Sequence, residues 1–403
     1  MMDDSAREAA QARVPRRGRM REFWGRVTEG LELQQLWEQF KAETRESYGF
    51  YSRDVDWSAI GEHKRWRRPF RIAWAIFMAM LMKLTPARRV VFLLACVLLI
   101  IDTDIHLGSA EVVIGTGTIG AILLVLLLAL ELADRITMKR DLEIAREIQR
   151  WLVPEKPPQI SGVDIAFASR PANTVAGDYY DAFLRRGSDS QQRLLLVVAD
   201  VAGKSVPAAL LMATLQASLQ TLSESGAALP EIVAGLNRYA CAHSLEGRRF
   251  TTAFFGELNL DTRKLTYINA GHNAPMLRRV TGKIESLDIG GLPLGIPAVA
   301  SSQAQYETGS ASLNSGDLLV IFTDGLVEAV DAGGDEYGDA RLTACVKQLP
   351  EVPAPAMLQR LVADVDAFVG TTRQRDDITC LIMKMGPASG TLASDTARST
   401  VAP

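Results

Sequence analysis

The chain has 403 residues, of which 48% are hydrophobic and 23% charged, and its formal net charge is −3. These values exclude a disordered chain, a collagen-like repeat and a globally basic nucleic-acid-binding protein. The charge is unevenly divided: residues 1–140 carry 21 Lys and Arg against 17 Asp and Glu, and the remainder carries 23 against 30. All six Trp lie at or before Trp151. We therefore expect two differently built parts.

Residues 1–87 are polar and mixed in charge, with no secretory signal before the first apolar stretch. They predict a cytoplasmic region that is partly helical and becomes basic toward a membrane. Between Glu62 and Asp102 there are eight Lys and Arg and no acidic residue. Residues 70–82 fit either an interfacial helix anchored by Trp66 and Trp74 or a further span, and we favour the interfacial helix.

Two apolar runs, at 90–101 and 112–130, contain no charged residue. We expect a transmembrane helical hairpin over 88–133, with spans at about 88–107 and 112–133, since a bilayer core requires about 20 apolar residues. Basic residues flank both outer ends and are absent from the connecting stretch, which places both termini in the cytoplasm. The alternative is a buried helical hairpin in a soluble core.

Residues 134–157 predict a linker helix. Apolar residues recur at helical spacing at Leu142, Ala145, Ile148 and Leu152, and Pro154 ends the pattern. With no helix breaker after residue 130, the helix is expected to continue from the second span. The spacing is equally compatible with a rod that forms a homodimer and transmits a signal and with a plain amphipathic connector.

Residues 158–386 change to strands with a few helices. Short continuous apolar runs such as RLLLVVAD and DLLVIFTD are typical of buried strands, and residues 251–270 predict a hairpin. Helices are expected at 206–223, 231–243 and 355–369. Strands with grouped helices indicate an α+β fold. The small, polar residues 387–403 predict a disordered tail.

Acidic residues stand at the ends of the buried strands. Asp178 lies in VAGDYYD, Asp200 ends LLLVVAD, Asp324 ends LLVIFTD, and Asp376 and Asp377 precede ITCLIM. Each alone is explained by a turn or a helix cap. Together they predict a carboxylate cluster, and carboxylates without His or Cys suit Mg²⁺ or Mn²⁺. Two such ions can activate a water toward a phosphoryl group.

Other enzyme motifs fit poorly. The Gly203-Lys204-Ser205 sequence lacks the first glycine of a P-loop, because position 198 is Val. The four cysteines, at positions 96, 241, 345 and 380, have no metal-ligand spacing and favour reduced thiols in a cytosolic compartment. His272, in the loop NAGHNAP, favours a structural role in a turn.

Seven segments in one order carry a family resemblance: REIQRWLVP, VAGDYYD, VADVAGKSVPAALLMA, NAGHNAP, GLPLG, FTDGLVEA and RDDIT. Over about residues 140–386 the chain resembles the bacterial stage II sporulation protein E (SpoIIE) family of serine phosphatases, in the protein phosphatase 2C superfamily. Two positions depart from that pattern, since Ala176 and Ser205 stand where the family usually or often has glycine.

The resemblance implies an α-β-β-α sandwich with two Mn²⁺ or Mg²⁺ ions between its sheets. Asp178 looks like the bridging ligand, and Asp200, the carbonyl of Val201, Asp324 and Asp376 look like further ligands. The implied nucleophile is a metal-bound water, so no side chain attacks. Asp377 looks like a neighbour that holds an outer-sphere water.

The resemblance also implies a protein serine/threonine phosphatase in the bacterial inner membrane, with its catalytic domain in the cytoplasm. The implied substrate is a signalling phosphoprotein such as an anti-sigma-factor antagonist. No nucleic-acid partner is expected. The alternative is a phosphatase-like scaffold that binds a partner without turnover.

Overall fold

The computed structural model describes residues 68–387, except residues 102, 107–112, 188, 190, 204, 244–248 and 297–305. The predicted cytoplasmic segment before residue 68 and the predicted disordered tail after residue 387 lie outside the described residues. The chain divides into two compact units, Met1–Asp134 and Arg135–Pro403.

The first unit is helical over most of its described length. It contains α4 (Arg68–Lys83), α5 (Pro86–Ile101), the antiparallel pair β1 (Asp104–His106) and β2 (Val113–Gly115), and the start of α6 (Thr116–Leu152). Its helices α5 and α6 approach closely, because a Cβ on Gly120 would lie 2.7 Å from the carbonyl oxygen of Ala95. Arg88 of α5 forms ion pairs with Glu131 and Asp134 of α6, at 3.0 and 2.7 Å.

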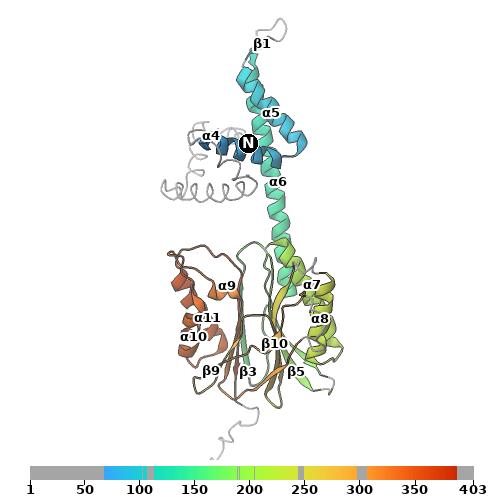
Figure 1. Ribbon diagram of the computed structural model, residues 1–403, viewed down its shortest axis with the longest axis vertical. Helices are drawn as coiled ribbons and strands as arrows, with labels where there is room; N and C mark the ends of the chain where they lie inside the picture. Colours follow the sequence, from blue (N-terminus) through green and yellow to red (C-terminus); the bar gives the residue numbers. More distant parts are fainter. Residues whose placement is uncertain are drawn as a thin grey trace, which may run out of the picture. The chain divides into compact units, whose positions relative to one another are not determined.

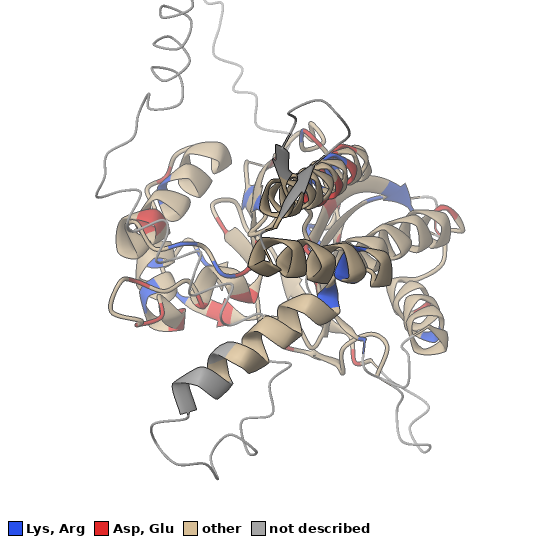
Figure 2. Cartoon of the chain, turned by 90° about the horizontal axis from the view of Figure 1, so that it is seen from above, with Lys and Arg blue, Asp and Glu red and all other residues tan. Residues whose placement is uncertain are grey.

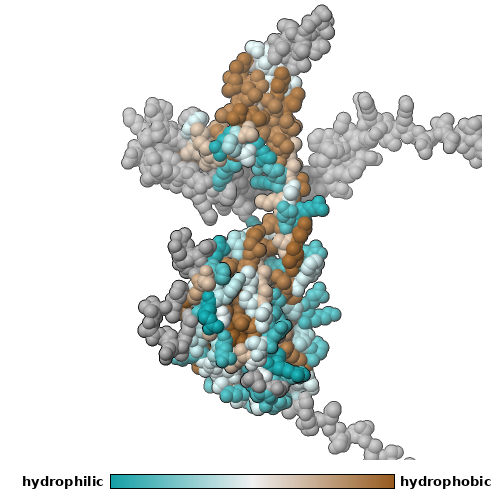
Figure 3. All heavy atoms as spheres, turned by 90° about the vertical axis from the view of Figure 1, so that its right-hand side faces the viewer, coloured by the Kyte–Doolittle hydropathy of each residue, from teal (hydrophilic) through white to brown (hydrophobic). Residues whose placement is uncertain are grey.

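One helix among the described residues, α6, is long and apolar enough to cross a membrane. The predicted first span corresponds to α5, whose 16 residues extend about 24 Å at 1.5 Å per residue, short of the ~30 Å hydrocarbon core. The structure therefore supports one candidate span, on α6, and the predicted first span of the hairpin lacks that support. Hydrophobic side chains nevertheless lie exposed on both helices (Figure 3). Ile100 and Leu128 are among the exposed residues. In Figure 2 the described helices of this unit are mostly uncharged.

The helix α6 is continuous to Leu152, as the lack of a breaker after residue 130 predicts. The division between the two units falls within it, after Asp134. Its residues from Arg135 onward therefore belong to the second unit, where Val153, just beyond the helix end, packs against a hydrophobic core.

The second unit contains two β-sheets covered by helices on both outer faces (Figure 1). One sheet has the strand order β10-β7-β6-β5-β4, with β11 also paired to β7, and the other has the order β3-β13-β12-β8-β9. The strands are β3 (Val163–Arg170), β4 (Tyr179–Arg186), β5 (Gln192–Val201), β6 (Thr251–Asn259), β7 (Lys264–Ala270), β8 (Met276–Arg278), β9 (Ile284–Ser286), β10 (Gly290–Gly291), β11 (Gly309–Ser312), β12 (Leu318–Phe322) and β13 (Ile378–Met385).

The outer helices lie in two groups. The first sheet is covered by α7 (Val206–Glu224) and α8 (Leu229–Ala242), and the second by α10 (Gly338–Gln348) and α11 (Ala354–Val369). A one-turn helix, α9 (Asp324–Val327), follows β12. The α-β-β-α sandwich and the α+β class predicted from the sequence are confirmed.

The continuous apolar strands are explained by this layering. All five residues of β12 are buried, as are Leu194 to Ala199 in β5. Each of these strands has the opposite sheet on one face and helices on the other, so both faces require apolar side chains. Burying one such Leu or Val contributes about 1.5–3 kcal/mol. The strand ends, where this packing stops, are the positions available for polar groups.

Candidate active site

The four aspartates proposed as ligands come from both sheets. Asp178 immediately precedes β4, and Asp200 is the penultimate residue of β5 in the same sheet. In the other sheet Asp324 begins α9 directly after β12, and Asp376 lies two residues before β13. Because β12 and β13 are antiparallel neighbours, the end of one strand and the start of the other lie at the same edge.

A buried threonine joins the two sheets at this edge. The hydroxyl of Thr323, which precedes Asp324, donates a hydrogen bond to Asp178 Oδ2 at 3.0 Å. The same hydroxyl accepts a hydrogen bond from the backbone N–H of Thr379 in β13, at 2.9 Å. Thr323 is fully buried, so this contact holds the Asp178 carboxylate beside the ends of β12 and β13.

Two glycines allow the aspartates to approach one another. A Cβ at Gly177 would lie 3.2 Å from the carbonyl oxygen of Val201 and 3.7 Å from Asp200 Oδ1. At Gly325 a Cβ would lie 2.0 Å from the carbonyl oxygen of Asp377 and 3.3 Å from Cβ of Asp376. The glycines before Asp178 and after Asp324 are thus required by close packing, which brings the proposed carbonyl ligand Val201 to the Asp178 loop.

Burial and the neighbouring negative charges raise the pKa values of two carboxyls in the cluster. Burial and the charge of Asp200 hold the pKa of Asp178 well above its usual range. Burial, together with the charges of Asp324, Asp376 and Asp377, raises the pKa of Asp200 to about 7. Protonation of a carboxyl or binding of a cation would therefore stabilise the cluster.

The donor chemistry of the cluster fits a hard divalent cation, because every proposed donor is a carboxylate or a backbone carbonyl oxygen. Within the described part of the chain, however, no three acidic, His or Cys side chains are gathered tightly enough to form a ligand group by themselves. The ligand assignment from the sequence therefore stays a prediction.

Asp377 lies beside this cluster, and its carboxylate binds the backbone. Its two oxygens accept hydrogen bonds from the N–H groups of Ala172 and Gly177, at 2.7 and 2.6 Å. These contacts hold the loop between β3 and β4, which leads into Asp178. The predicted role of holding an outer-sphere water is untested, whereas the loop contact is visible in the structure.

Two cavities adjoin the aspartates. The first, of about 210 Å³, is lined by Asp178, by Arg146 and Gln149 of α6 and by Met212 of α7. The second, of about 490 Å³, is lined by Asp376 and by further basic and acidic side chains, namely Arg170, Arg373, Arg375, Glu328, Glu336 and Asp366. Both α6 and the loop before β13 thus contribute side chains close to the cluster.

His272 makes contacts that agree with the structural role predicted for it. Its backbone N–H and C=O bond the side chain of Asn269, at 2.7 and 2.9 Å, and Nδ1 lies 3.1 Å from the hydroxyl of Thr252. Burial lowers the pKa of His272 to about 4, so the ring is neutral at pH 7. A neutral ring held by its own turn is suited to packing.

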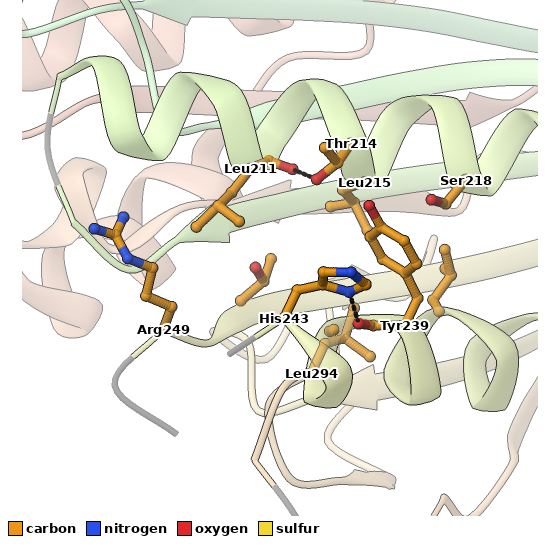
Figure 4. Close-up of a pocket in the computed structure, with 11 residues that line it drawn as sticks. Leu211, Thr214, Leu215, Ser218, Tyr239, His243, Arg249 and Leu294 are labelled. Atoms are coloured by element: carbon orange, nitrogen blue, oxygen red, sulfur yellow. Dashed lines mark hydrogen bonds between the residues drawn. The ribbon is translucent and has the colours of Figure 1, made fainter. Parts of the chain in front are cut away.

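A further cavity, of about 200 Å³, lies between α7 and α8 (Figure 4). Its lining includes Tyr239, His243 and Arg249, with His243 Nδ1 2.9 Å from the carbonyl oxygen of Tyr239. None of the proposed ligands lines it. We assign it no part in the candidate active site.

Two residues of the site were not singled out from the sequence. Thr323 precedes the Asp324-Gly325 pair, and Gln149 lies within REIQRWLVP. Both fall inside motifs that carried the family resemblance, so their position in those motifs was the available signal. Nothing in their spacing indicated which group each would contact.

The comparisons with known proteins concern mainly the second unit. Residues 190–386 match the family described as "Stage II sporulation protein E (SpoIIE)". The chain is 31% identical over 198 residues to the Phosphoserine phosphatase RsbU of Bacillus subtilis, covering 49% of this chain and 56% of RsbU. It is 23% identical over 254 residues to the Phosphoserine phosphatase RsbP of the same organism, covering 62% of this chain and 58% of RsbP.

Among solved structures, the SiaA-PP2C domain of Pseudomonas aeruginosa is similar in fold. Its TM-score is 0.54 at 22% identity, and the match covers 63% of this chain and 99% of that domain. This likeness supports the protein phosphatase 2C-like fold. The chain spans a little over half the length of the two curated relatives.

Proposed function

We propose that this chain, whose second unit carries a SpoIIE-family domain of the protein phosphatase 2C type, is a divalent-metal-dependent protein serine/threonine phosphatase. The observation that carries the proposal is the aspartate cluster, in which burial and the charges of neighbouring carboxyls raise the pKa values of Asp178 and Asp200. A buried carboxylate such as that of Asp178 is costly unless a cation compensates it.

Five groups would hold the metal: the carboxylates of Asp178, Asp200, Asp324 and Asp376 and the carbonyl of Val201. When bound, two Mn²⁺ or Mg²⁺ ions would supply an activated water and neutralise charge on the phosphoryl oxygens. The chain's own residues orient that site. Thr323 fixes one oxygen of Asp178, and Asp377 fixes the loop that precedes it. No side chain is needed as the nucleophile.

The proposed substrate is phosphoserine or phosphothreonine on a signalling protein, such as an anti-sigma-factor antagonist. Two relatives named as phosphoserine phosphatases support this substrate class. The mixed-charge cavity beside Asp376, with arginines from β3 and from the loop before β13, offers room for a peptide segment next to the cluster.

The proposal extends to the membrane and to a homodimer. The apolar part of α6 would anchor the chain in the bacterial inner membrane, with the catalytic unit in the cytoplasm. A hairpin with a second span on α5 has less support, because only α6 is long enough among the described helices. On α6, Ile144, Ile148 and Trp151 are 47%, 49% and 75% exposed at helical spacing. A second copy of the helix would cover this stripe.

An insertion tests the linker part of the proposal. Two residues inserted near Lys139 rotate the downstream helix by about 200°. We expect altered dimer formation, measured by light scattering in detergent, together with altered phosphatase activity. Unchanged assembly and activity would refute the coupling while leaving the phosphatase proposal intact.

Activity is tested on the full chain in detergent with an aryl phosphate and a phosphoserine peptide. We expect turnover that requires added Mn²⁺ or Mg²⁺, stops with a chelator and is abolished in Asp200→Asn and Asp324→Asn. If the folded chain binds Mn²⁺ but hydrolyses neither substrate, the scaffold alternative becomes the better explanation.

A further inference from the structure

The end of α6 makes a reciprocal contact with the active-site loop. The side-chain amide of Gln149 donates a hydrogen bond from Nε2 to the carbonyl oxygen of Ala176, at 2.7 Å. In return the backbone N–H of Ala176 donates to Oε1 of Gln149, at 3.0 Å. Ala176 is buried and lies two residues before Asp178. One side chain thus satisfies both backbone groups of a buried loop residue.

The same loop is held from its other side by Asp377, which accepts the N–H groups of Ala172 and Gly177. Gly177 also packs tightly against the end of β5 and against α7, because a Cβ there would lie 3.2 Å from the Val201 carbonyl oxygen and 3.3 Å from Cβ of Ala208. The backbone just before Asp178 is therefore fixed by hydrogen bonds on both sides and has little room to shift.

The two anchors differ in where they come from. Asp377 belongs to the segment that enters β13, so it moves with the sandwich. Gln149 belongs to the last turn of α6, which ends at Leu152. Gln149 and Asp178 also line the same cavity of about 210 Å³. A rotation or withdrawal of the α6 end would break both Gln149 hydrogen bonds and leave the buried backbone groups of Ala176 unpaired, which is unfavourable.

We infer that Gln149 is a positioning residue that sets the Asp178 loop in its metal-binding geometry, so that the seating of the α6 end controls the affinity of the site for its divalent cation. This inference rests on the proposed metal-dependent function. It assigns to one side chain the contact through which the linker helix acts on the site. Gln149 acts through the Ala176 backbone and not on the substrate.

The test measures Mn²⁺ binding by the folded full chain in detergent, from the electron paramagnetic resonance signal of free Mn²⁺. Gln149→Met retains the length of the side chain and removes both hydrogen bonds. We expect the dissociation constant for Mn²⁺ to rise about tenfold, the order expected for two lost neutral hydrogen bonds. We also expect kcat for an aryl phosphate to recover at saturating Mn²⁺, because the substituted side chain does not touch the reacting atoms.

Two controls separate positioning from general destabilisation. Gln220→Met makes the same substitution at another half-buried glutamine, whose Nε2 donates to Asp181 at 2.9 Å. Glu147→Gln changes an exposed residue of the same turn of α6. We expect both to bind Mn²⁺ within about twofold of the unsubstituted chain. Gln149→Asn, one methylene too short to reach Ala176, provides a second variant if Gln149→Met fails to fold.

Each outcome bears on one proposal. Normal Mn²⁺ affinity in folded Gln149→Met or Gln149→Asn would overturn the inference while the phosphatase proposal stands. An equal loss of affinity in Gln220→Met would overturn it too, because the effect would then be general. If the unsubstituted chain binds no Mn²⁺, the proposed function itself fails, and the inference fails with it.

Discussion

Glu257 and Asp178 are equally buried, each 3% exposed, yet the charges around them differ. Glu257 of β6 forms ion pairs with Arg185 of β4 and with Arg193 of β5, the latter at 2.7 Å. These residues come from three adjacent strands of one sheet. The chain therefore supplies its own compensation for this buried carboxylate.

Asp178, unlike Glu257, lies beside other carboxyls. The strongest influences on its pKa are burial and the negative charge of Asp200, both of which favour protonation, and the hydroxyls of Thr379 and Thr323 oppose them only in part. The same sandwich thus contains one buried carboxylate paired with arginines and one whose pKa is raised by burial and by neighbouring carboxyls. The first stabilises the fold, whereas the second is suited to a cation from solution.

The largest expected effect comes from removing a charge from the aspartate cluster. Asp178→Asn should lower phosphatase activity by at least about 10³-fold, because metal-assisted charge stabilisation is worth several kcal/mol. The measurement is kcat/KM for an aryl phosphate at saturating Mn²⁺. The large effect is expected because Asp178 contacts the second sheet through Thr323 and so belongs to both halves of the site.

Asp181→Asn is the matched control for that variant. Asp181 is also buried and lies on β4, but its carboxylate accepts hydrogen bonds from Tyr179 Oη and from Gln220, at 2.8 and 2.9 Å. We expect the folded control to retain activity within about threefold, since the Asp181 carboxylate is bound by Tyr179 and Gln220 and is not among the proposed metal ligands. Equal losses in both variants would contradict the assignment of Asp178.

The second effect concerns Glu257 and its ion pairs with Arg185 and Arg193. Glu257→Gln should destabilise the fold by about 3–5 kcal/mol, because it leaves the buried Arg185 and its neighbour Arg193 without their carboxylate. The measurement is the thermal unfolding midpoint of the metal-free full chain in detergent. Asp189→Asn is the control: Asp189 is the 42% exposed second partner of Arg193, and its removal should leave the thermal midpoint nearly unchanged.

The third effect is a pH dependence. Burial lowers the pKa of His272 to about 4, below its ordinary value of 6.5. Between these values the unfolded chain binds more protons than the folded one, so stability falls as the pH falls. From pH 7 to pH 5 this residue should cost about 2 kcal/mol.

His272→Asn should remove that part of the pH dependence of urea unfolding. The exposed His243 offers the control, since His243→Asn leaves the buried ring in place. If both variants keep the full pH dependence of the unsubstituted chain, another group is responsible.

The polar strand ends were predictable from the sequence, because an acid that follows a run such as LLLVVAD stands where apolar packing stops. Their order in the chain, matched to a family, also predicted the sandwich. The helices at 206–223 and 355–369 agree with α7 and α11, and the second ends before Gly370, which has a φ of 63°. These features depend on local pattern, which the sequence carries directly.

What depends on tertiary contacts was not predictable. The helix α10 has a mixed composition and was missed, and it packs through buried residues such as Leu342 and Val346. The contacts of Asp377 and Gln149 with loop backbone join residues 200 and 27 positions apart. Neither spacing nor residue type indicates which distant N–H a side chain will bind.

The last expected effect has the opposite sign to that of Glu257→Gln. Asp200→Asn should stabilise the metal-free protein at pH 7, because it removes a partly buried carboxyl whose pKa is raised to about 7 by burial and by Asp324, Asp376 and Asp377. A group with a raised pKa in the folded state binds more protons when folded. Its cost to stability therefore grows as the pH rises from about 4 to 7, and the advantage of the variant should shrink on acidification.

Added Mn²⁺ should make the unsubstituted chain more stable than Asp200→Asn. A ligand that binds only the folded state raises its stability by mass action, so the unsubstituted chain should gain in thermal midpoint with Mn²⁺ and Asp200→Asn should gain much less. Glu257→Gln, whose defect lies outside the cluster, should gain as much as the unsubstituted chain does. If Asp200→Asn destabilises the metal-free protein as Glu257→Gln does, the Asp200 carboxylate stabilises the metal-free fold just as that of Glu257 does. That result would refute the proposed difference between the two sites.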